Sequence, residues 1–418
     1  MKKNYSLLLL LSVAILSNQY CFGAVTVLNL SSAQTVTDLI TNSSTALTGA
    51  TNVLIVVPDG YTGQAGLVAD LTGLPASVKA VTLRGASSNT VMKTLQINVS
   101  GTNALDSLNM RRIQFNGVDD GTTIGSEYLF YPGAGTSVGV FSIDSCSARN
   151  YKGALRFANG TYRNIQINNS IFRSLGNYGF ITYPLVNATT ATITVSNSTF
   201  YSIDQSILYL KNATNTAVNI SNCTFDNILN TTANFYYLNN TTGHSLSISS
   251  SIFGKTNSPT TASGVFGTPS PYTVTGCISA TDWGTTAATA ITGLTAYPGA
   301  STALFKSPST FNSTTVTSSV VGDYTLLDNT VGSVGDPRWR KVITGLKTIK
   351  NNIFAYFADQ NLIVNNVEVG SVISVYSFNG SLLNKQIANS NKVTVPVNSA
   401  CIVKITSNKE SVCLKMIK

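Results

Sequence analysis

Short segments in the middle of the chain alternate apolar and polar residues at every second position. Ile165 and Ile167 show this pattern, and Ile193 and Val195 show it again. A period of two residues is typical of a β-strand with one buried face. No helical pattern lies between these segments, so the sequence predicts a chain built mainly from strands and turns.

The alternating segments repeat, with starts 24, 28, 25, 28 and 26 residues apart. A period of this size is typical of solenoids, in which each unit buries its apolar face only by stacking on the next one. A related segment at residues 110–115 starts 33 residues before the next, which predicts an insertion around residues 119–135. The six repeated segments are residues 143–146, 167–172, 195–200, 220–225, 248–253 and 274–277.

Stacking would place equivalent residues of neighbouring coils about 4.8 Å apart, so that like side chains form ladders. We expect an aromatic stack inside the coils and asparagine amides that bond the turn backbone and one another. Cysteine and serine share a third position, where we interpret the cysteines as buried packing residues, because a free cysteine behaves as a small hydrophobe. The ladders are Phe172, Phe200, Phe225 and Phe253; Asn169, Asn197 and Asn222; and Cys146, Cys223 and Cys277.

The start of the chain has the form of a secretory signal peptide. Two lysines precede an apolar run at residues 7–15, which is too short to span a bilayer, and small residues follow at Gly23 and Ala24. We therefore expect residues 1–23 to be cleaved and the mature protein to be secreted or held at the outer-membrane surface. Cys21 leaves a lipid anchor as the alternative. No transmembrane segment is expected.

The charge pattern argues against a nucleic-acid-binding protein. Only 10% of the residues are charged, and of the formal charge of +9, two units belong to the leader and five to residues 342–418. The remaining +2 is spread over the middle of the chain, which leaves no basic patch for DNA or RNA. With 43% apolar residues, the chain also lacks the composition of a disordered protein.

The sequence contains no pattern typical of a metal site. Once Cys21 is removed, five cysteines remain, none in a Cys-x-x-Cys pair, and His244 is the single histidine. The acidic residues of the repeats are scattered, and Asp119 and Asp120 precede a glycine, as in a turn. We therefore expect no cofactor, because a Ca²⁺ site is unsupported by an acidic cluster.

Three features carry a resemblance to a known group of proteins. The pattern Asn-x-x-Phe recurs over residues 108–280, residues 80–85 read Ala-Val-Thr-Leu-Arg-Gly, and residues 335–339 read Gly-Asp-Pro-Arg-Trp. Residues 25–340 thereby resemble the pectate-lyase-like β-helix superfamily, and more narrowly β-helix proteins secreted by Bacteroidetes. The resemblance implies a right-handed coil and an exported protein that meets polysaccharide. It implies little about chemistry, because one fold serves many functions.

The last part of the chain resembles the C-terminal sorting domain of proteins exported by the Bacteroidetes type IX secretion system. Three short segments between residues 361 and 405 follow its three-part pattern, although Ala400 and Cys401 stand where that family usually has a Gly-x-Tyr turn and strand. The resemblance implies the secretion machinery as a partner of this domain.

The predicted fold class is all-β, with three parts. Residues 1–23 are the signal peptide, and residues 24–341 form a right-handed parallel β-helix, which is a solenoid. Residues 342–418 form a small C-terminal antiparallel β-sandwich, the sorting domain.

A candidate binding surface follows the second strand of each coil. If the flanking apolar residues point inward, Arg156, Tyr209 and Tyr237 form an outward row, and Lys211 lies two residues beyond Tyr209. Aromatic faces stack on sugar rings and basic groups pair with acidic sugars, so this row predicts a polysaccharide as the partner. The alternative is that these are ordinary exposed strand residues.

The catalytic residues stay unknown at this level. The resemblance implies, for a lyase, an Arg or Lys base beside a metal-neutralised carboxylate, and Arg156 and Arg112 are the candidates. A hydrolase needs two or three carboxylates on one strand face, and no such cluster lies on a repeat strand. The hypotheses are polysaccharide binding, cleavage of an acidic polysaccharide by a lyase, and a non-enzymatic structural or adhesive role at the cell surface.

Overall fold

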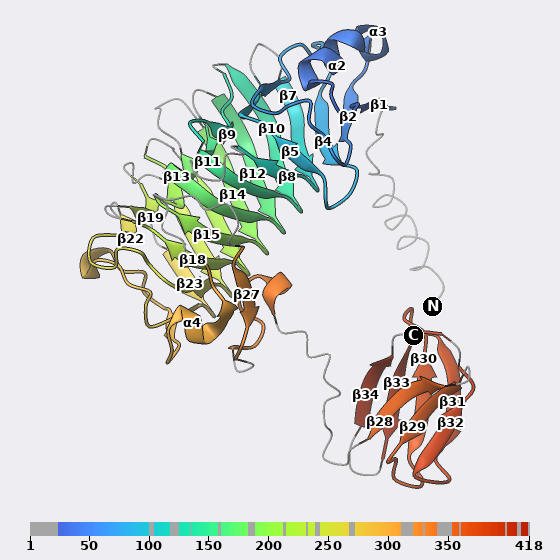
Figure 1. The fold of residues 1–418 in the computed structure, drawn as a ribbon. Coiled ribbons are helices and arrows are strands. Elements are labelled where there is room, and N and C mark those ends of the chain that lie inside the picture. Colours follow the sequence, from blue (N-terminus) through green and yellow to red (C-terminus); the bar gives the residue numbers. More distant parts are fainter. Residues whose placement is uncertain are drawn as a thin grey trace, which may run out of the picture. The chain divides into compact units, whose positions relative to one another are not determined.

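The computed structural model describes most of the chain that follows the predicted leader (Figure 1). Two compact units are present, residues 1–340 and 341–418. Residues 1–23 lie outside the described residues, so the signal peptide stays a prediction. The described residues are 24–99, 104–117, 125–133, 135–157, 160–182, 189–211, 215–230, 233–238, 243–266, 272–310, 321–328, 331–340, 353–358, 361–397, 399–407 and 411–416.

The first unit contains a parallel β-solenoid over residues 25–279, which confirms the predicted fold class. One side of its coils is sheet A, whose ten strands each pair in parallel with the strand one coil away. Its strands, in spatial order, are β1 (Val25–Asn29), β2 (Asn52–Val57), β4 (Ala80–Gly85), β7 (Ala104–Arg111), β10 (Thr136–Asp144), β12 (Gly160–Asn168), β14 (Thr189–Ser196), β17 (Ala217–Ser221), β20 (Ser245–Ser249) and β23 (Tyr272–Thr275).

The rest of each coil forms sheet B, which has 15 strands. Several coils contribute a first strand and then a second strand to it, such as β15 and β16, whereas β11 and β13 run through both positions. Its strands are β3 (Val68–Asp70), β5 (Val91–Lys93), β6 (Gln96–Asn98), β8 (Gln114–Asn116), β9 (Tyr128–Phe130), β11 (Ser147–Arg156), β13 (Ile171–Thr182), β15 (Thr199–Ile203), β16 (Leu208–Tyr209), β18 (Thr224–Ile228), β19 (Asn234–Tyr237), β21 (Ile252–Phe253), β22 (Ser263–Phe266), β24 (Ile278–Ser279) and β25 (Thr295–Ala296).

The coils stack in the register that the sequence repeat predicts. Met110 pairs with Ile143, and the row continues through every predicted segment. Three earlier strands add Leu83, Ile55 and Leu28 to the same row. The sequence repeat missed these three, because the residues after them lack the Asn-x-x-Phe pattern. From Ile143 on, the row is Ile167, Val195, Ile220, Ile248 and Val274.

The predicted aromatic ladder is confirmed. The ring centroids of Phe172 and Phe200 are 5.6 Å apart, those of Phe200 and Phe225 are 5.1 Å apart, and the Phe225–Phe253 distance is 5.4 Å. All four rings are fully buried and nearly parallel to their neighbours. Fully burying such a side chain contributes about 1.5–3 kcal/mol to stability, so the ladder is a substantial part of the core.

The predicted asparagine ladder is wrong in its hydrogen-bond partners. Asn169 and Asn197 have φ angles of 49°, in the left-handed region that asparagine tolerates. The Asn169 amide donates to the hydroxyl of Ser145, and the Asn197 amide donates to the side-chain oxygen of Asn168. Because the left-handed turn lays each amide over polar side chains of the preceding coil, these amides bond those side chains instead of one another.

The interpretation of the repeat cysteines as packing residues is confirmed. Cys146, Cys223 and Cys277 are buried, and all described cysteines are free thiols. The backbone N–H of Cys146 donates to the hydroxyl of Ser170 over 3.1 Å, and that of Cys223 donates to Ser251 over the same distance. Small side chains at this turn position therefore accept a hydrogen bond from the coil before them.

Two short helices that the sequence analysis did not predict lie at the N-terminal end of the solenoid (Figure 1). They are α2 (Val36–Asn42) and α3 (Ser44–Leu47). The hydroxyl of Thr35 caps α2 by accepting a 3.0 Å hydrogen bond from the backbone of Asp38. Leu39 and Leu47 are buried in the same core as the coils, so the helices protect the first coil from water.

Residues 301–310, 321–328 and 331–340, which we call the cover, leave the coil and pack on the outer face of sheet B. The side chains of Leu304, Phe305 and Tyr324 form a separate apolar cluster with Tyr201 and Ile252 of the sheet. The cover contains α4 (Ser301–Leu304), β26 (Phe305–Ser307), β27 (Asp323–Leu326) and the 3-10 helix η3 (Pro337–Trp339), and a further 3-10 helix, η1 (Ala287–Thr289), precedes it.

The second unit is a small pair of antiparallel sheets, as predicted. Leu362 and Val395 of one sheet and Val375 and Val403 of the other belong to a single buried core, so the sheets face each other. No helix within the described part of the chain has the length and apolar character needed to cross a bilayer. One sheet contains β28 (Phe354–Ala358), β29 (Asn361–Asn365) and β32 (Lys392–Val395); the other contains β31 (Leu382–Ile387), β30 (Val372–Tyr376), β33 (Cys401–Thr406) and β34 (Ser411–Met416).

Candidate functional site

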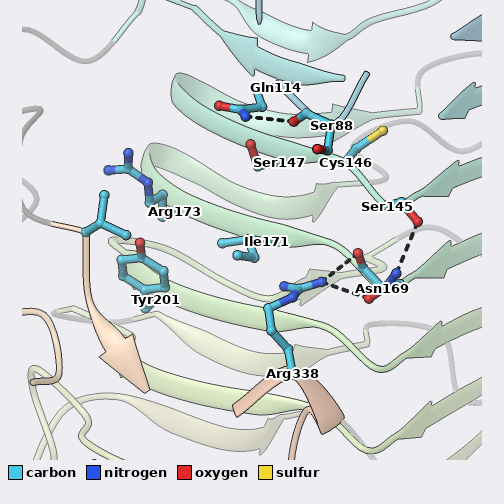
Figure 2. Close-up of a pocket in the computed structure, with 11 residues that line it drawn as sticks. Ser88, Gln114, Ser145, Cys146, Ser147, Asn169, Ile171, Arg173, Tyr201 and Arg338 are labelled. Carbon is cyan, nitrogen blue, oxygen red and sulfur yellow. Dashed lines mark hydrogen bonds between the residues drawn. The ribbon is translucent and has the colours of Figure 1, made fainter. Parts of the chain in front are cut away.

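An open groove of about 410 Å³ lies on the outer face of sheet B beside the cover (Figure 2). Its floor is built by register partners on three successive coils, Gln114, Ser147 and Ile171. These side chains point outward because the residues that follow them in the strands point into the core. The described residues that line the groove are Ser88, Gln114, Ser145, Cys146, Ser147, Asn169, Ile171, Arg173, Tyr201, Val321 and Arg338.

One wall of the groove comes from the cover. The guanidinium of Arg338 donates to the backbone oxygen of Asn169 over 2.7 Å and to its side-chain oxygen over 2.9 Å. On its other side it lies 3.4 Å from the carboxylate of Asp336, which is buried. These contacts fix the position of the Arg338 side chain. It is still 27% exposed, so a ligand in the groove can reach it.

The groove is positively charged. Arg173 lies two residues after Ile171 on β13, and Figure 2 shows Arg173 and Arg338 on either side of Ile171. No Asp or Glu is among the described residues that line the groove, and Arg173 has no carboxylate partner within the described part of the chain. Asp336 compensates only Arg338, so the two cations leave a net positive charge that favours the binding of an anion.

Tyr201 supplies a neutral hydroxyl at the far end of the groove floor. Burial raises the pKa of this hydroxyl, and the positive charges of Arg173 and Arg149 oppose that effect. The ring of Tyr201 packs against Tyr324 of the cover at a centroid distance of 4.9 Å. The hydroxyl therefore stays protonated near neutral pH and can donate a hydrogen bond.

Arg156, the first residue predicted for a binding site, lies outside this groove. It is half-buried at the end of β11, and its guanidinium donates a 2.9 Å hydrogen bond to the hydroxyl of Tyr128. The rings of Tyr128, Tyr131 and Tyr178 surround the guanidinium, with centroids 5.1, 5.0 and 5.6 Å away. Arg156 is therefore held by tyrosines rather than by a carboxylate.

The two predicted tyrosines of the row lie on the second strands of sheet B. Tyr209 and Tyr237 are register partners, and their half-buried rings stack with centroids 4.7 Å apart and an angle of 12°. Lys211 is exposed, just past the end of β16. In the register, Thr182 lies between Arg156 and Tyr209. The structure thus places Arg156 and both tyrosines in one row across the coils.

Arg112, the second candidate for a lyase base, lies elsewhere. It is exposed, with a φ of 53°, at the turn between β7 and β8. Its backbone N–H donates to the backbone oxygen of Asp144, as that of Asn169 does to Ser196 two coils later in the stack. Arg112 and Arg156 belong to different parts of the coil, so they do not form a joint site.

No metal site can be described. In the ranges that the structure covers, no three His, Cys, Asp or Glu side chains gather as they would around an ion. Asp119 and Asp120 lie outside those ranges. His244 is buried, and its Nδ1 accepts a hydrogen bond from the backbone of Thr216, which is a structural role.

Most of the groove was missed at the level of sequence. No sequence pattern distinguishes Arg173 from the other basic residues, and Arg338 appears only as part of Gly-Asp-Pro-Arg-Trp. That pentapeptide was the sequence feature from which the docked segment, and with it Arg338, could have been found. Gly335 has a φ of 81°, and a side chain there would contact Ile252, so the sequence marks a segment that docks tightly on the coils.

The comparisons with known proteins say little about activity. Residues 70–203 are similar to a family described as "Domain of unknown function (DUF4957)". This range includes Gln114, Arg173 and Tyr201 of the groove, and also Arg112 and Arg156. No curated protein and no solved structure matched the chain.

Proposed function

We propose that this protein binds an acidic polysaccharide in the groove between sheet B and the cover. The observation that carries the proposal is the pair of guanidinium groups, Arg173 and Arg338, in a groove whose described lining contains no carboxylate. Guanidinium groups bind carboxylates through two parallel hydrogen bonds, so they suit the carboxylates of uronic acids.

The size and the remaining side chains of the groove support the same ligand. Its volume of about 410 Å³ lies in the range of small-molecule sites. Gln114, Ser147 and Asn169 offer neutral donors and acceptors for sugar hydroxyls, and Ile171 offers an apolar patch for a sugar ring. The groove is open, so a chain longer than the groove can continue past it.

The resemblance to pectate-lyase-like proteins supports this ligand class but not a reaction. Export, which the leader predicts, would bring the protein to polysaccharide outside the cell. Arg173 and Arg338 can hold a uronate, whereas a lyase also needs a base beside the bound sugar. The function proposed is therefore binding, and lyase activity would be an addition to it.

Affinity electrophoresis tests the proposal. The purified chain should be retarded in gels that contain polygalacturonate or alginate and not in gels that contain dextran, and the retardation should weaken with salt. Arg173→Ala should weaken binding roughly tenfold, the loss of one charge-assisted contact. Absorbance of unsaturated products in the same samples reports any lyase activity.

Arg163→Ala is the matched control, because Arg163 is exposed on β12 of sheet A and its loss removes the same charge from a different face. Equal retardation of the wild type on acidic and neutral glycans would contradict the proposal. So would an Arg173→Ala protein that binds as tightly as the wild type.

A further inference from the structure

Two cations on the second strands of sheet B converge on one tyrosine. The ammonium of Lys152 lies 4.7 Å from the ring centroid of Tyr178, and the guanidinium of Arg156 lies 5.6 Å from the same centroid. Tyr178 is 38% exposed, so this cluster is reached from solvent. It is separate from the groove, with which it shares no lining residue.

These two cations have no anionic partner within the described part of the chain. Every ion pair found there involves other residues. Arg156 is half-buried and its Nε is buried without a hydrogen-bond partner, so its positive charge is stabilised by tyrosine rings and one phenol hydroxyl but is not neutralised. Like charges held beside one ring repel each other, and an anion bound between them would relieve that repulsion.

A stacked aromatic pair continues the same row. Arg156, Thr182, Tyr209 and Tyr237 are successive register partners, so Tyr209 lies two coils, or roughly 10 Å, from Arg156. The side chain of Thr182 is short and buried, so it does not fill the surface between the Arg156 guanidinium and the Tyr209 ring. Arg156 and Tyr209 flank this surface at a spacing of roughly 10 Å. One sugar ring fits between them, since van der Waals contacts between carbon atoms are about 3.5–4.0 Å.

From this arrangement we infer a second glycan site. A carboxylate or sulfate group of an acidic sugar binds at Lys152 and Arg156, and the sugar ring lies over Thr182 against Tyr209, whose ring is supported by Tyr237. The site goes beyond the proposed function because it uses other residues, and it rests on that function only for the class of ligand. A glycan bound here runs along the stack of coils.

Isothermal titration of the full chain with short oligosaccharides tests the inference. Three probes separate the sources of the anion: an oligogalacturonate, a sulfated oligosaccharide and a neutral oligosaccharide of the same length. Lys152→Ala and Tyr209→Leu should each weaken binding of at least one acidic probe roughly tenfold at this site and leave the thermal unfolding temperature unchanged. Arg163→Ala is again the control.

The outcomes distinguish the two sites. If Arg173→Ala removes one of two binding events and Lys152→Ala removes the other, both proposals stand. If the wild type binds acidic probes with one site that only Arg173→Ala affects, the second site is wrong and the groove stands. If only Lys152→Ala and Tyr209→Leu affect binding, the groove is wrong and the second site stands. A wild type that binds no acidic probe overturns both.

Discussion

Arg338 donates two hydrogen bonds to Asn169, which lies 169 residues earlier in the chain. The same guanidinium faces Asp336, which is 1% exposed and accepts a 2.6 Å hydrogen bond from the hydroxyl of Thr199. One side chain therefore joins the cover to a coil turn and compensates a buried carboxylate. Both roles depend on the planar, forked guanidinium.

Replacing Arg338 should loosen the cover without unfolding the solenoid. Arg338→Ala removes the cation that pairs with the Asp336 carboxylate and leaves only the weaker effect of Arg340, which costs about 1.5–3 kcal/mol for a hydrogen bond to a charged group. Hydrogen exchange should accelerate in residues 321–328 and 331–340 and stay unchanged in β10 and β12. Arg338→Lys keeps the charge and should recover only part of the protection. Unchanged exchange in the cover after Arg338→Ala would show that the contact has no structural role.

The aromatic ladder should be sensitive to a single truncation. Phe200 is fully buried between Phe172 and Phe225, so Phe200→Ala should lower the free energy of unfolding by about 3–5 kcal/mol. Both tryptophans, Trp283 and Trp339, belong to the first unit, so their fluorescence during urea unfolding reports this unit alone.

Thr194→Ala is the control for this truncation. Its side chain lies on the outer face of β14, in the same coil as Phe200 but in sheet A and outside the core, and its loss should change the unfolding free energy by less than about 0.5 kcal/mol. If Phe200→Ala lowers the free energy of unfolding by less than about 1 kcal/mol, the neighbouring rings close the cavity and the ladder contributes little to stability.

The contrast between Phe200 and Arg338 shows what the sequence could predict. Phe200 recurs with the coil, and stacking of like on like is a local consequence of the repeat, so its partners followed from alignment alone. Arg338 occurs once and contacts a residue in a distant coil, so no periodicity relates the two. Tyr201 is similar: alternation predicts that it faces outward, but only the fold-back of the cover buries it.

The row of Arg156, Tyr209 and Tyr237 lies between these cases. Its side chains alternate with buried residues, and the coil repeat aligned the two tyrosines. The rings around Arg156 could not be predicted, because Tyr128 comes from β9, a strand inside the stretch that sequence analysis treated as an insertion.

Cysteine reactivity should follow burial. Burial raises the pKa of the Cys146 thiol to about 12, and Cys223 and Cys277 are also buried, whereas Cys413 is exposed. In native protein that begins at Ala24, a thiol reagent should modify Cys413 rapidly and the repeat cysteines only after unfolding. Cys413→Ser should remove the rapid phase. Rapid modification of two or more thiols in that variant would mean that the coils open readily.

Asp226 should make the first unit less stable as the pH rises. Its carboxyl is buried under the cover, where its oxygen accepts hydrogen bonds from the hydroxyl of Ser301 and the backbone of Lys255. Burial raises its pKa from 3.8 to about 6, and the Asp282 charge acts in the same direction. The folded state then holds the proton more tightly than the unfolded state, so the stabilisation is complete below pH 3.8 and is lost as the pH rises through about 6.

Asp226→Asn should therefore raise the unfolding free energy at pH 7.5 by up to about 3 kcal/mol and flatten its pH dependence between pH 4 and 7. Asp323 provides the opposite control. Its pKa is lowered by hydrogen bonds from Thr325 and by Lys306, so Asp323→Asn should remove a stabilisation that is present at neutral pH and lost in acid. Tryptophan fluorescence in urea at a series of pH values measures both. An Asp226→Asn protein that is less stable than the wild type at pH 7.5 would show that ionised Asp226 stabilises the contact between cover and coil.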